Sequence, residues 1–113
     1  MAGRAGAGPR REPFSRVSRL LALAIEIERK LRDGTLQNYA EAARLGAVSQ
    51  SRLEQILGLL NLSPAIQDAV LFLPRTAEPG RITEKRLRGI AEIIDWQSQQ
   101  ARFDELLANG HLV

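Results

Sequence analysis

Apolar residues recur three and four positions apart along most of this chain, and this spacing constrains the fold more than any other feature. The first such stripe joins Val17, Leu20, Ala24, Ile27 and Leu31, which is the period of one face of an α-helix. No stretch of useful length alternates apolar and polar residues, as a half-buried strand does. Aromatic residues make up only 4% of the 113 residues, and an aliphatic core suits helices packed on helices. We therefore expect an all-α fold of five or six helices.

Capping residues divide the chain into these helices. The first helix is expected to start near Ser15 and to end at Asp33-Gly34, where glycine suits a left-handed C-cap. The last helix is expected from about Gln97 to Ala108, closed by Asn109-Gly110. The helices between them should begin after the N-caps Asn38, Ser49, Ser63 and Thr83. Their expected buried faces are Leu53, Ile56, Leu57 and Leu60 in the third helix, Ile66, Ala69, Val70 and Leu73 in the fourth, and Leu87, Ile90, Ala91 and Ile94 in the fifth.

Positive charge is concentrated at the N-terminal end. Residues 1–20 contain five arginines and one glutamate, a net charge of +4, whereas the whole chain carries +3. We predict a disordered basic arm over residues 1–14, a helical domain over residues 15–108 and a tail over residues 109–113. A basic arm on a near-neutral body is typical of nucleic-acid-binding proteins, although a solvated tail explains the same charges.

Composition also excludes several kinds of site. The chain has no cysteine and a single histidine, His111, which excludes disulfides and a structural zinc site. The acidic pairs lack an accompanying histidine, cysteine or phosphate-binding loop, so we expect no enzyme activity, no cofactor and no metal. No apolar stretch reaches the roughly 18 residues that a membrane span needs. The expected location is the cytoplasm, in association with the nucleoid.

Residues 38–60 predict a helix-turn-helix, because a short helix, a turn with glycine and a second helix follow one another. Ala42 or Ala43 can supply the small residue where the two helices cross. Gly46 is expected to adopt the positive φ of the turn, and Val48 to fill the wedge between the helices. In the second helix, Gly58 predicts close packing or a bend.

Burial of one face leaves a polar surface at the start of the second helix. Glutamine and arginine can pair with adenine and guanine in the major groove, and recognition helices read bases with their N-terminal residues. The expected base-reading residues are Gln50, Ser51, Arg52 and Gln55. The expected phosphate contacts are Ser49, Arg44, Arg10, Arg11, Arg16, Lys85 and Arg86. The basic residues near position 85 fit a solvated helix face equally well.

The segment YAEAARLGAVSQSRLEQILGLL, followed by residues 61–67 (NLSPAIQ), resembles the helix-turn-helix region of the ParB/KorB partition-protein family. The resemblance covers residues 38–73 and implies a DNA-reading module. Ala47-Val48 departs from the family's pattern, either because the turn is one residue longer or because the leucine has shifted. The first 37 residues hold no counterpart of the family's nucleotide-binding domain. Short accessory proteins encoded beside site-specific recombinases are similar.

Together these features predict a sequence-specific double-stranded DNA-binding protein. The resemblance implies a transcriptional regulator or an accessory factor of a mobile element, with a recombinase or another DNA-processing protein as a further partner. One short recognition helix reads few bases, so we expect a homodimer formed through Ile90, Ile94, Trp96 and Phe103. The alternative is a helical protein–protein adaptor in which the third helix only packs in the core.

Overall fold

The computed structural model describes residues 13–75 and 82–111, without the side chains of residues 109–111. Within these ranges the chain is all-α, as predicted, and its only β pairing is one isolated bridge. The helices are α1 (Arg16–Arg32), α2 (Tyr39–Leu45), α3 (Gln50–Leu57), the 3₁₀ helix η1 (Gly58–Asn61), α4 (Pro64–Leu71), α5 (Glu84–Ala91) and α6 (Trp96–His111).

The four predicted N-caps are confirmed, and Ser15 caps the first helix in the same way. In each case the cap oxygen accepts a hydrogen bond from the amide three residues later, which satisfies a free donor of the first turn. The capping residues are Ser15, Asn38, Ser49, Ser63 and Thr83. Glu41 also reaches back across the start of α2, but it accepts from the amide of Gln37 (2.6 Å) and not from that of the cap.

The last helix is longer than predicted at both ends. Asp95 caps it by accepting from the Ser98 amide (2.9 Å), so α6 begins at Trp96. It continues through Asn109 and Gly110 to His111, which places part of the predicted tail in the helix. Glycine disfavours a helix by only about 1 kcal/mol, and in the last turn this penalty does not stop α6.

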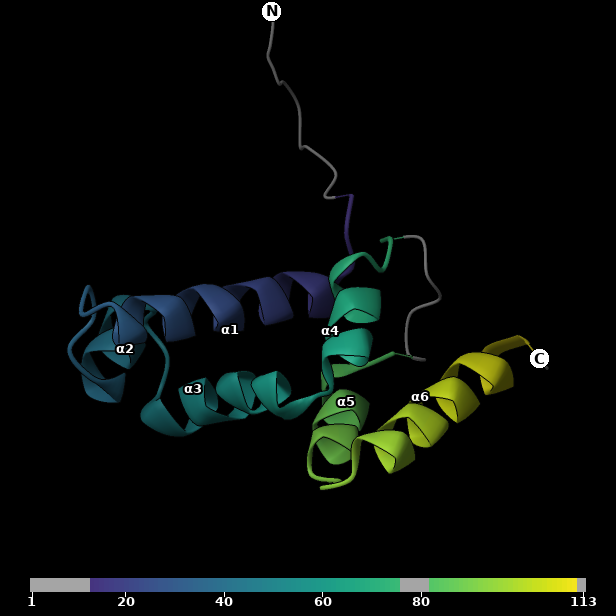
Figure 1. Cartoon of the computed structure of the whole chain (residues 1–113). Coiled ribbons are helices and arrows are strands. Elements are labelled where there is room, and N and C mark those ends of the chain that lie inside the picture. The colour runs from purple at the N-terminus through teal and green to yellow at the C-terminus, as the bar shows by residue number, and fades with distance from the viewer. Residues whose placement is uncertain (1–12, 76–81, 112–113) are drawn as a thin grey trace, which may run out of the picture.

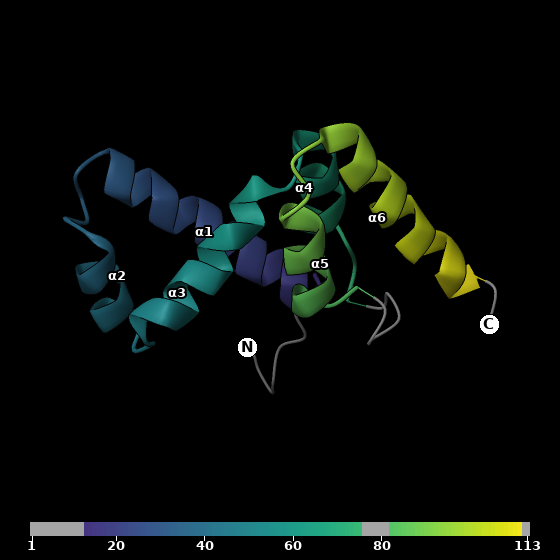
Figure 2. The same ribbon diagram turned by 90° about the horizontal axis from the view of Figure 1, so that it is seen from below.

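α2 and α6 lie at opposite ends of the helical arrangement (Figures 1 and 2). α3 turns back alongside α1 after α2, and α4 and α5 lie near the N-terminal half of α1 (Figure 1). Pro13 and Phe14, which the sequence analysis placed in the arm, join this end of the body. Phe14 bridges Pro74, and the Arg75 amide donates to the Pro13 carbonyl (3.1 Å).

We call the larger of two buried clusters the main core. It lies where α1, η1, α4, α5 and α6 meet, and its buried members are Val17, Leu21, Leu59, Leu62, Ile66, Val70, Leu87, Ile90 and Phe103. The predicted stripe of α1 was wrong in part, because Leu21 is fully buried while Leu20 and Ile27 are only partly covered. In α4 the predicted Ala69 is exposed.

Gly58 marks a change of helix type. α3 ends there and η1 begins, so the tighter 3₁₀ winding turns Leu59 into the core in place of the predicted Leu60. A Cβ added at Gly58 would meet no atom within 4 Å. The predicted close packing at Gly58 is therefore wrong, and the change of helix type is what distinguishes this position.

The buried face of α5 is shorter than predicted. Leu87 and Ile90 are buried, but α5 stops at Ala91, so Ile94 falls in the turn before α6 and is 97% exposed. The 3.6-residue period applies only while the backbone stays helical.

We call the smaller cluster the alanine cluster. Its buried members are Leu36, Ala42, Ala43 and Leu53, and it joins α2 and α3 to the segment that precedes α2. Partly buried Ile27, Leu31 and Leu57 pack against it. This cluster holds the two helices of the predicted helix-turn-helix together.

A buried glutamine connects the start of α4 to α6. Gln99 Nε2 donates to the carbonyls of Asn61 (3.1 Å) and Ile93 (2.9 Å), and its Oε1 accepts from the Ser63 amide (2.7 Å). A buried amide needs such partners to offset its lost hydration. Gln99 was not among the expected core residues, because glutamine is seldom fully buried.

Candidate nucleic-acid interface

The turn between α2 and α3 comprises residues 46–49, and its backbone geometry differs from the prediction. Gly46 has a φ of −83°, whereas Ala47 has a φ of 56°. The Ala47 amide donates to the Arg44 carbonyl and the Val48 amide to the Ala43 carbonyl. These bonds form a Schellman motif with Ala47 at the left-handed position, so the predicted positive φ of Gly46 was one residue too early.

Small residues let the two helices approach one another. Ala42 and Ala43 are both buried, as predicted for the crossing. Val48 is 37% exposed, so it does not fill the wedge as expected. Leu53 from α3 and Leu36 before α2 fill this space, because the Schellman turn leaves Val48 near the surface.

Within α2, α3 and the turn between them, the most accessible part is the turn together with the start of α3. Every residue from 44 to 51 is exposed. The Ser49 hydroxyl is engaged as the N-cap, since it accepts from the Arg52 amide (3.0 Å). The side chains of Gln50 and Ser51 have no hydrogen-bond partner among the described residues. Two polar side chains and a helix N-terminus are thus exposed on this side of α3.

Arg52 is held by a carboxylate of α5. Its Nη2 donates to Glu84 Oε1 (2.8 Å), and its Nη1 donates to Glu84 Oε2. The Arg52 side chain is 30% exposed and that of Glu84 is 15% exposed. The hydrogen bond from Arg52 holds the pKa of the Glu84 carboxyl below its usual range, and the same bond raises the pKa of Arg52. The expected base-reading fork of Arg52 is therefore occupied within the protein.

The same Arg52 nitrogen contacts a second expected base-reading residue. Nη1 of Arg52 donates to Gln55 Oε1 (3.2 Å), one turn along the exposed side of α3. Glu84, Arg52 and Gln55 thus form a chain of hydrogen bonds that runs from α5 to the surface of α3. We call it the Glu84–Arg52–Gln55 chain.

Two further arginines lie near Glu84. Arg88 Nε is 3.4 Å from Glu84 Oε2, and the charge of Arg16 is close enough to lower the pKa of the Glu84 carboxyl. Three positive charges, from α1, α3 and α5, are therefore gathered around one carboxylate. Sequence analysis named Arg16 and Arg52 but missed Glu84, because its partner lies 32 residues away and no local pattern marks such a pair.

The other expected phosphate contacts are dispersed. Arg44 is exposed at the end of α2, and Lys85 and Arg86 are exposed in the first turn of α5. Arg10 and Arg11 lie outside the described residues. Of the five expected residues that the structure describes, it links Ser49 and Arg16 to the surroundings of Arg52.

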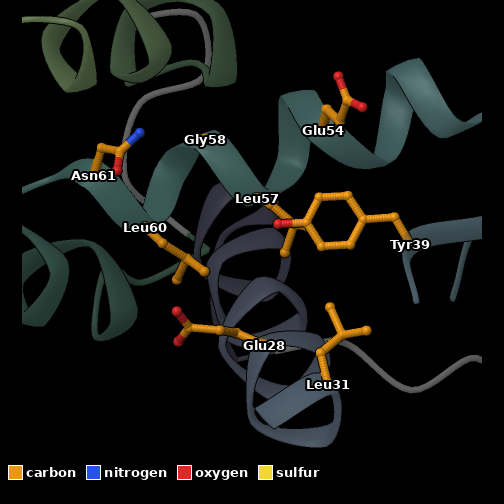
Figure 3. A pocket seen from close by; sticks show the side chains of 8 residues that line it. All are labelled: Glu28, Leu31, Tyr39, Glu54, Leu57, Gly58, Leu60 and Asn61. Carbon is orange, nitrogen blue, oxygen red and sulfur yellow. The ribbon is translucent and has the colours of Figure 1, made fainter. Parts of the chain in front are cut away.

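Two shallow hollows flank α3. The one in Figure 3, about 320 Å³, lies beside α1 and α2, and the Tyr39 ring extends across it toward Leu57. Glu28 and Glu54 lie on opposite sides of this hollow (Figure 3). The second hollow, about 350 Å³, includes Gln55 and Arg88 in its lining. Within the described ranges, no group of three or more histidine, cysteine or acidic side chains could hold a metal ion.

Glu54 belongs to the exposed face of α3 but was not among the expected residues. It lines both hollows together with Gly58 and Asn61. A carboxylate can accept a hydrogen bond from cytosine N4 in the major groove, while it repels phosphate. The period of α3 alone could have placed it on this face, one turn beyond Gln50.

The expected dimer surface is divided between the core and the surface. Ile90 and Phe103 are buried in the main core and cannot contact a second chain. Ile94 is almost fully exposed and Trp96 is 56% exposed, at the corner between α5 and α6. Only these two members of the predicted surface remain accessible.

No helix within the described ranges is long and apolar enough to cross a membrane. Comparison of the chain with models of protein families, with curated proteins and with solved structures finds no match.

Proposed function

We propose that this chain is a sequence-specific double-stranded DNA-binding protein that inserts the start of α3 into the major groove. The observation that carries this proposal is the continuous exposure of residues 44–51. Major-groove recognition needs a helix whose N-terminal side chains protrude beyond the rest of the fold. Gln50 and Ser51 satisfy this need, and Gln55 follows on the next turn.

The backbone around α3 supports the proposal because it is fixed before any ligand binds. The Ser49 cap and the Schellman turn satisfy the backbone groups between α2 and α3. A preorganised recognition helix loses little conformational entropy when it binds. The exposed N-terminus of α3 also suits a phosphate oxygen.

The arginines near Glu84 support a role in backbone contact. Arg16, Arg52 and Arg88 exceed the charge of the single carboxylate they surround. Excess positive charge beside a recognition helix stabilises the complex through phosphate neutralisation and counterion release. Arg44, at the other side of the turn, is placed to contribute in the same way.

The resemblance of residues 38–73 to the ParB/KorB helix-turn-helix suggests the biological setting. We propose a transcriptional regulator or an accessory factor of a mobile element, acting on the nucleoid. A single recognition helix of eight residues reads a short site, so we further propose a homodimer on a two-fold site. Ile94 and Trp96 are the exposed apolar residues that a second copy would cover.

The test is selection from a random-sequence duplex pool at several salt concentrations, followed by sequencing of the bound fraction. We expect enrichment of a short two-fold site and an affinity that falls steeply as salt rises. The double variant Gln50→Ala/Gln55→Ala should lose enrichment and keep its helicity. The matched control Gln97→Ala/Gln100→Ala, on α6, should bind as the unchanged protein does.

Two outcomes would contradict the proposal. Salt-sensitive binding without enrichment would mean that the charges act alone and that α3 reads no bases. No binding at low salt would favour the adaptor alternative, for which the exposed Ile94 and Trp96 would then be the first surface to test. Sedimentation at micromolar concentration tests the dimer separately, and a monomer there would contradict it.

A further inference from the structure

The amide of Gln55 is not free to turn, because Arg52 fixes one end of it. A guanidinium group carries only donors, so the atom of Gln55 that faces Arg52 Nη1 at 3.2 Å must be the carbonyl oxygen Oε1. The nitrogen Nε2, with two N–H donors, is then the end of the amide left for an external partner.

Arg52 in turn cannot easily move away from Gln55. Both of its terminal nitrogens bond to the two oxygens of Glu84, and paired charge-assisted hydrogen bonds of this kind have a fixed geometry. Glu84 is largely covered, and it is anchored in the first turn of α5, directly after the Thr83 cap. The orientation of the Gln55 amide is therefore set by a residue of a different helix.

We propose that the Glu84–Arg52–Gln55 chain makes Gln55 a hydrogen-bond donor that selects guanine in the major groove. This inference rests on the proposed function. Guanine is the base whose major-groove edge presents two acceptors, N7 and O6, and no donor. Adenine and cytosine each present an amino group there, and thymine presents one acceptor beside a methyl group.

Glutamine usually pairs with adenine, because its oxygen accepts from N6 while its nitrogen donates to N7. The Gln55 oxygen keeps a second lone pair, but an adenine amino group approaching it would meet the Arg52 guanidinium, which is a cation and a donor. The structure thus reverses the preference that glutamine has in isolation. Glu84 is a positioning residue here, and Gln55 is the residue that touches the base.

The experiment compares the sites selected by three proteins from the same random duplex pool. The unchanged chain should select guanine at one position of each half-site. The double variant Arg52→Met/Glu84→Met removes both charged groups of the clamp, and it should shift that position toward adenine. Gln55→Glu presents only acceptors and should shift it toward cytosine. Each shift should change relative affinity by roughly tenfold or more, and the other positions should stay the same.

Gln97→Glu, on the exposed first turn of α6, introduces the same charge change away from α3 and should leave the selected site unchanged. A loss of overall affinity with no change of base would show that the clamp is merely structural, and it would overturn the inference. Adenine at the Gln55-dependent position of the unchanged chain would overturn it as well, while the proposed function would stand. Failure of the unchanged chain to select any site would overturn both.

Discussion

The main core and the alanine cluster stabilise the two ends of this molecule by different means. The main core draws large aliphatic side chains and Phe103 from five helical segments, so burial of apolar area supplies most of its stability. The alanine cluster buries Leu36 and Leu53 with two alanines, which contribute little area but let α2 and α3 approach closely. Arg52 adds a polar link from this cluster's helix α3 to Glu84 on α5.

The difference indicates how the fold leaves the proposed recognition surface exposed. Helices that bury little area leave more of their side chains outside, and the run of residues 44–51 lies at this end. The large aliphatic core holds the fold, while the small cluster holds α3 at an angle that keeps its first turn accessible. The large apolar core and the proposed recognition surface thus lie in different parts of a short chain.

The largest expected effect comes from the main core. Phe103→Ala removes a side chain that is almost fully buried between helices, so the free energy of unfolding should fall by about 3–5 kcal/mol. Urea denaturation followed by circular dichroism measures this change. Leu107→Ala, on the partly exposed side of the same helix, is the control. A loss of less than about 1 kcal/mol for Phe103→Ala would mean that α6 contributes little to the core.

The buried glutamine should rank second. Gln99→Leu leaves the Ser63 amide and the Asn61 and Ile93 carbonyls without their partner, and we expect a loss of roughly 3 kcal/mol in the free energy of unfolding. The neighbouring Gln100, whose side chain bonds only to Asp104, provides the control Gln100→Leu. If the two variants proved equally stable, the Gln99 bonds would contribute nothing measurable.

Native-state hydrogen exchange compares the two ends directly. The Ala43 amide in α2 should exchange at least about tenfold faster than the Val70 amide in α4, after correction for intrinsic rates, because α2 opens without unfolding the main core. NMR at neutral pH measures both amides in one sample. Equal protection at both positions would show that the two clusters unfold as one unit.

The link between the two ends should depend on pH. The bond from Arg52 lowers the pKa of Glu84 below its ordinary value of 4.5, so the pair stabilises the fold above that value and is lost as pH falls through the lowered pKa. At pH 7, Glu84→Gln should reduce the free energy of unfolding by about 1 kcal/mol, and the difference from the unchanged chain should shrink in acid. Glu105→Gln breaks an exposed pair with Arg102 and serves as the control. If the lower stability of Glu84→Gln persisted unchanged in acid, it would not arise from the ion pair with Arg52.

The smallest expected effect is at the turn. Ala47 has a positive φ that strains any residue with a Cβ, so Ala47→Gly should raise the free energy of unfolding by about 0.5–1 kcal/mol. Gly46→Ala should change it by less than about 0.5 kcal/mol, because the φ of Gly46 is negative and an added Cβ would meet only ordinary contacts. Thermal and urea unfolding of both variants test this order. If Gly46→Ala changed the free energy of unfolding more than Ala47→Gly does, the positive φ of the turn would belong to Gly46, as the sequence predicted.

Short-range bonds explain what could be inferred from the amino-acid order alone. An N-cap oxygen reaches an amide three residues away, and an apolar stripe repeats within one helical turn, so neither depends on distant parts of the chain. The starts of α1 to α5 and the all-α class were therefore predictable. The exposed Gln50 and Ser51 followed from the same period, because Leu53 and Ile56 fix which side of α3 is buried.

Only the tertiary structure decided which side chains meet across helices. Arg52 finds Glu84 at a separation of 32 residues, and Gln99 finds Ser63 at a separation of 36. The left-handed Ala47, the 3₁₀ turn that buries Leu59 and the exposure of Ile94 likewise follow from where helices stop and pack. Such outcomes depend on the summed packing of several elements, which can override the local preference of any one residue. For this reason Arg52, which sequence analysis assigned to DNA, pairs instead with a carboxylate that lies 32 residues away in the sequence.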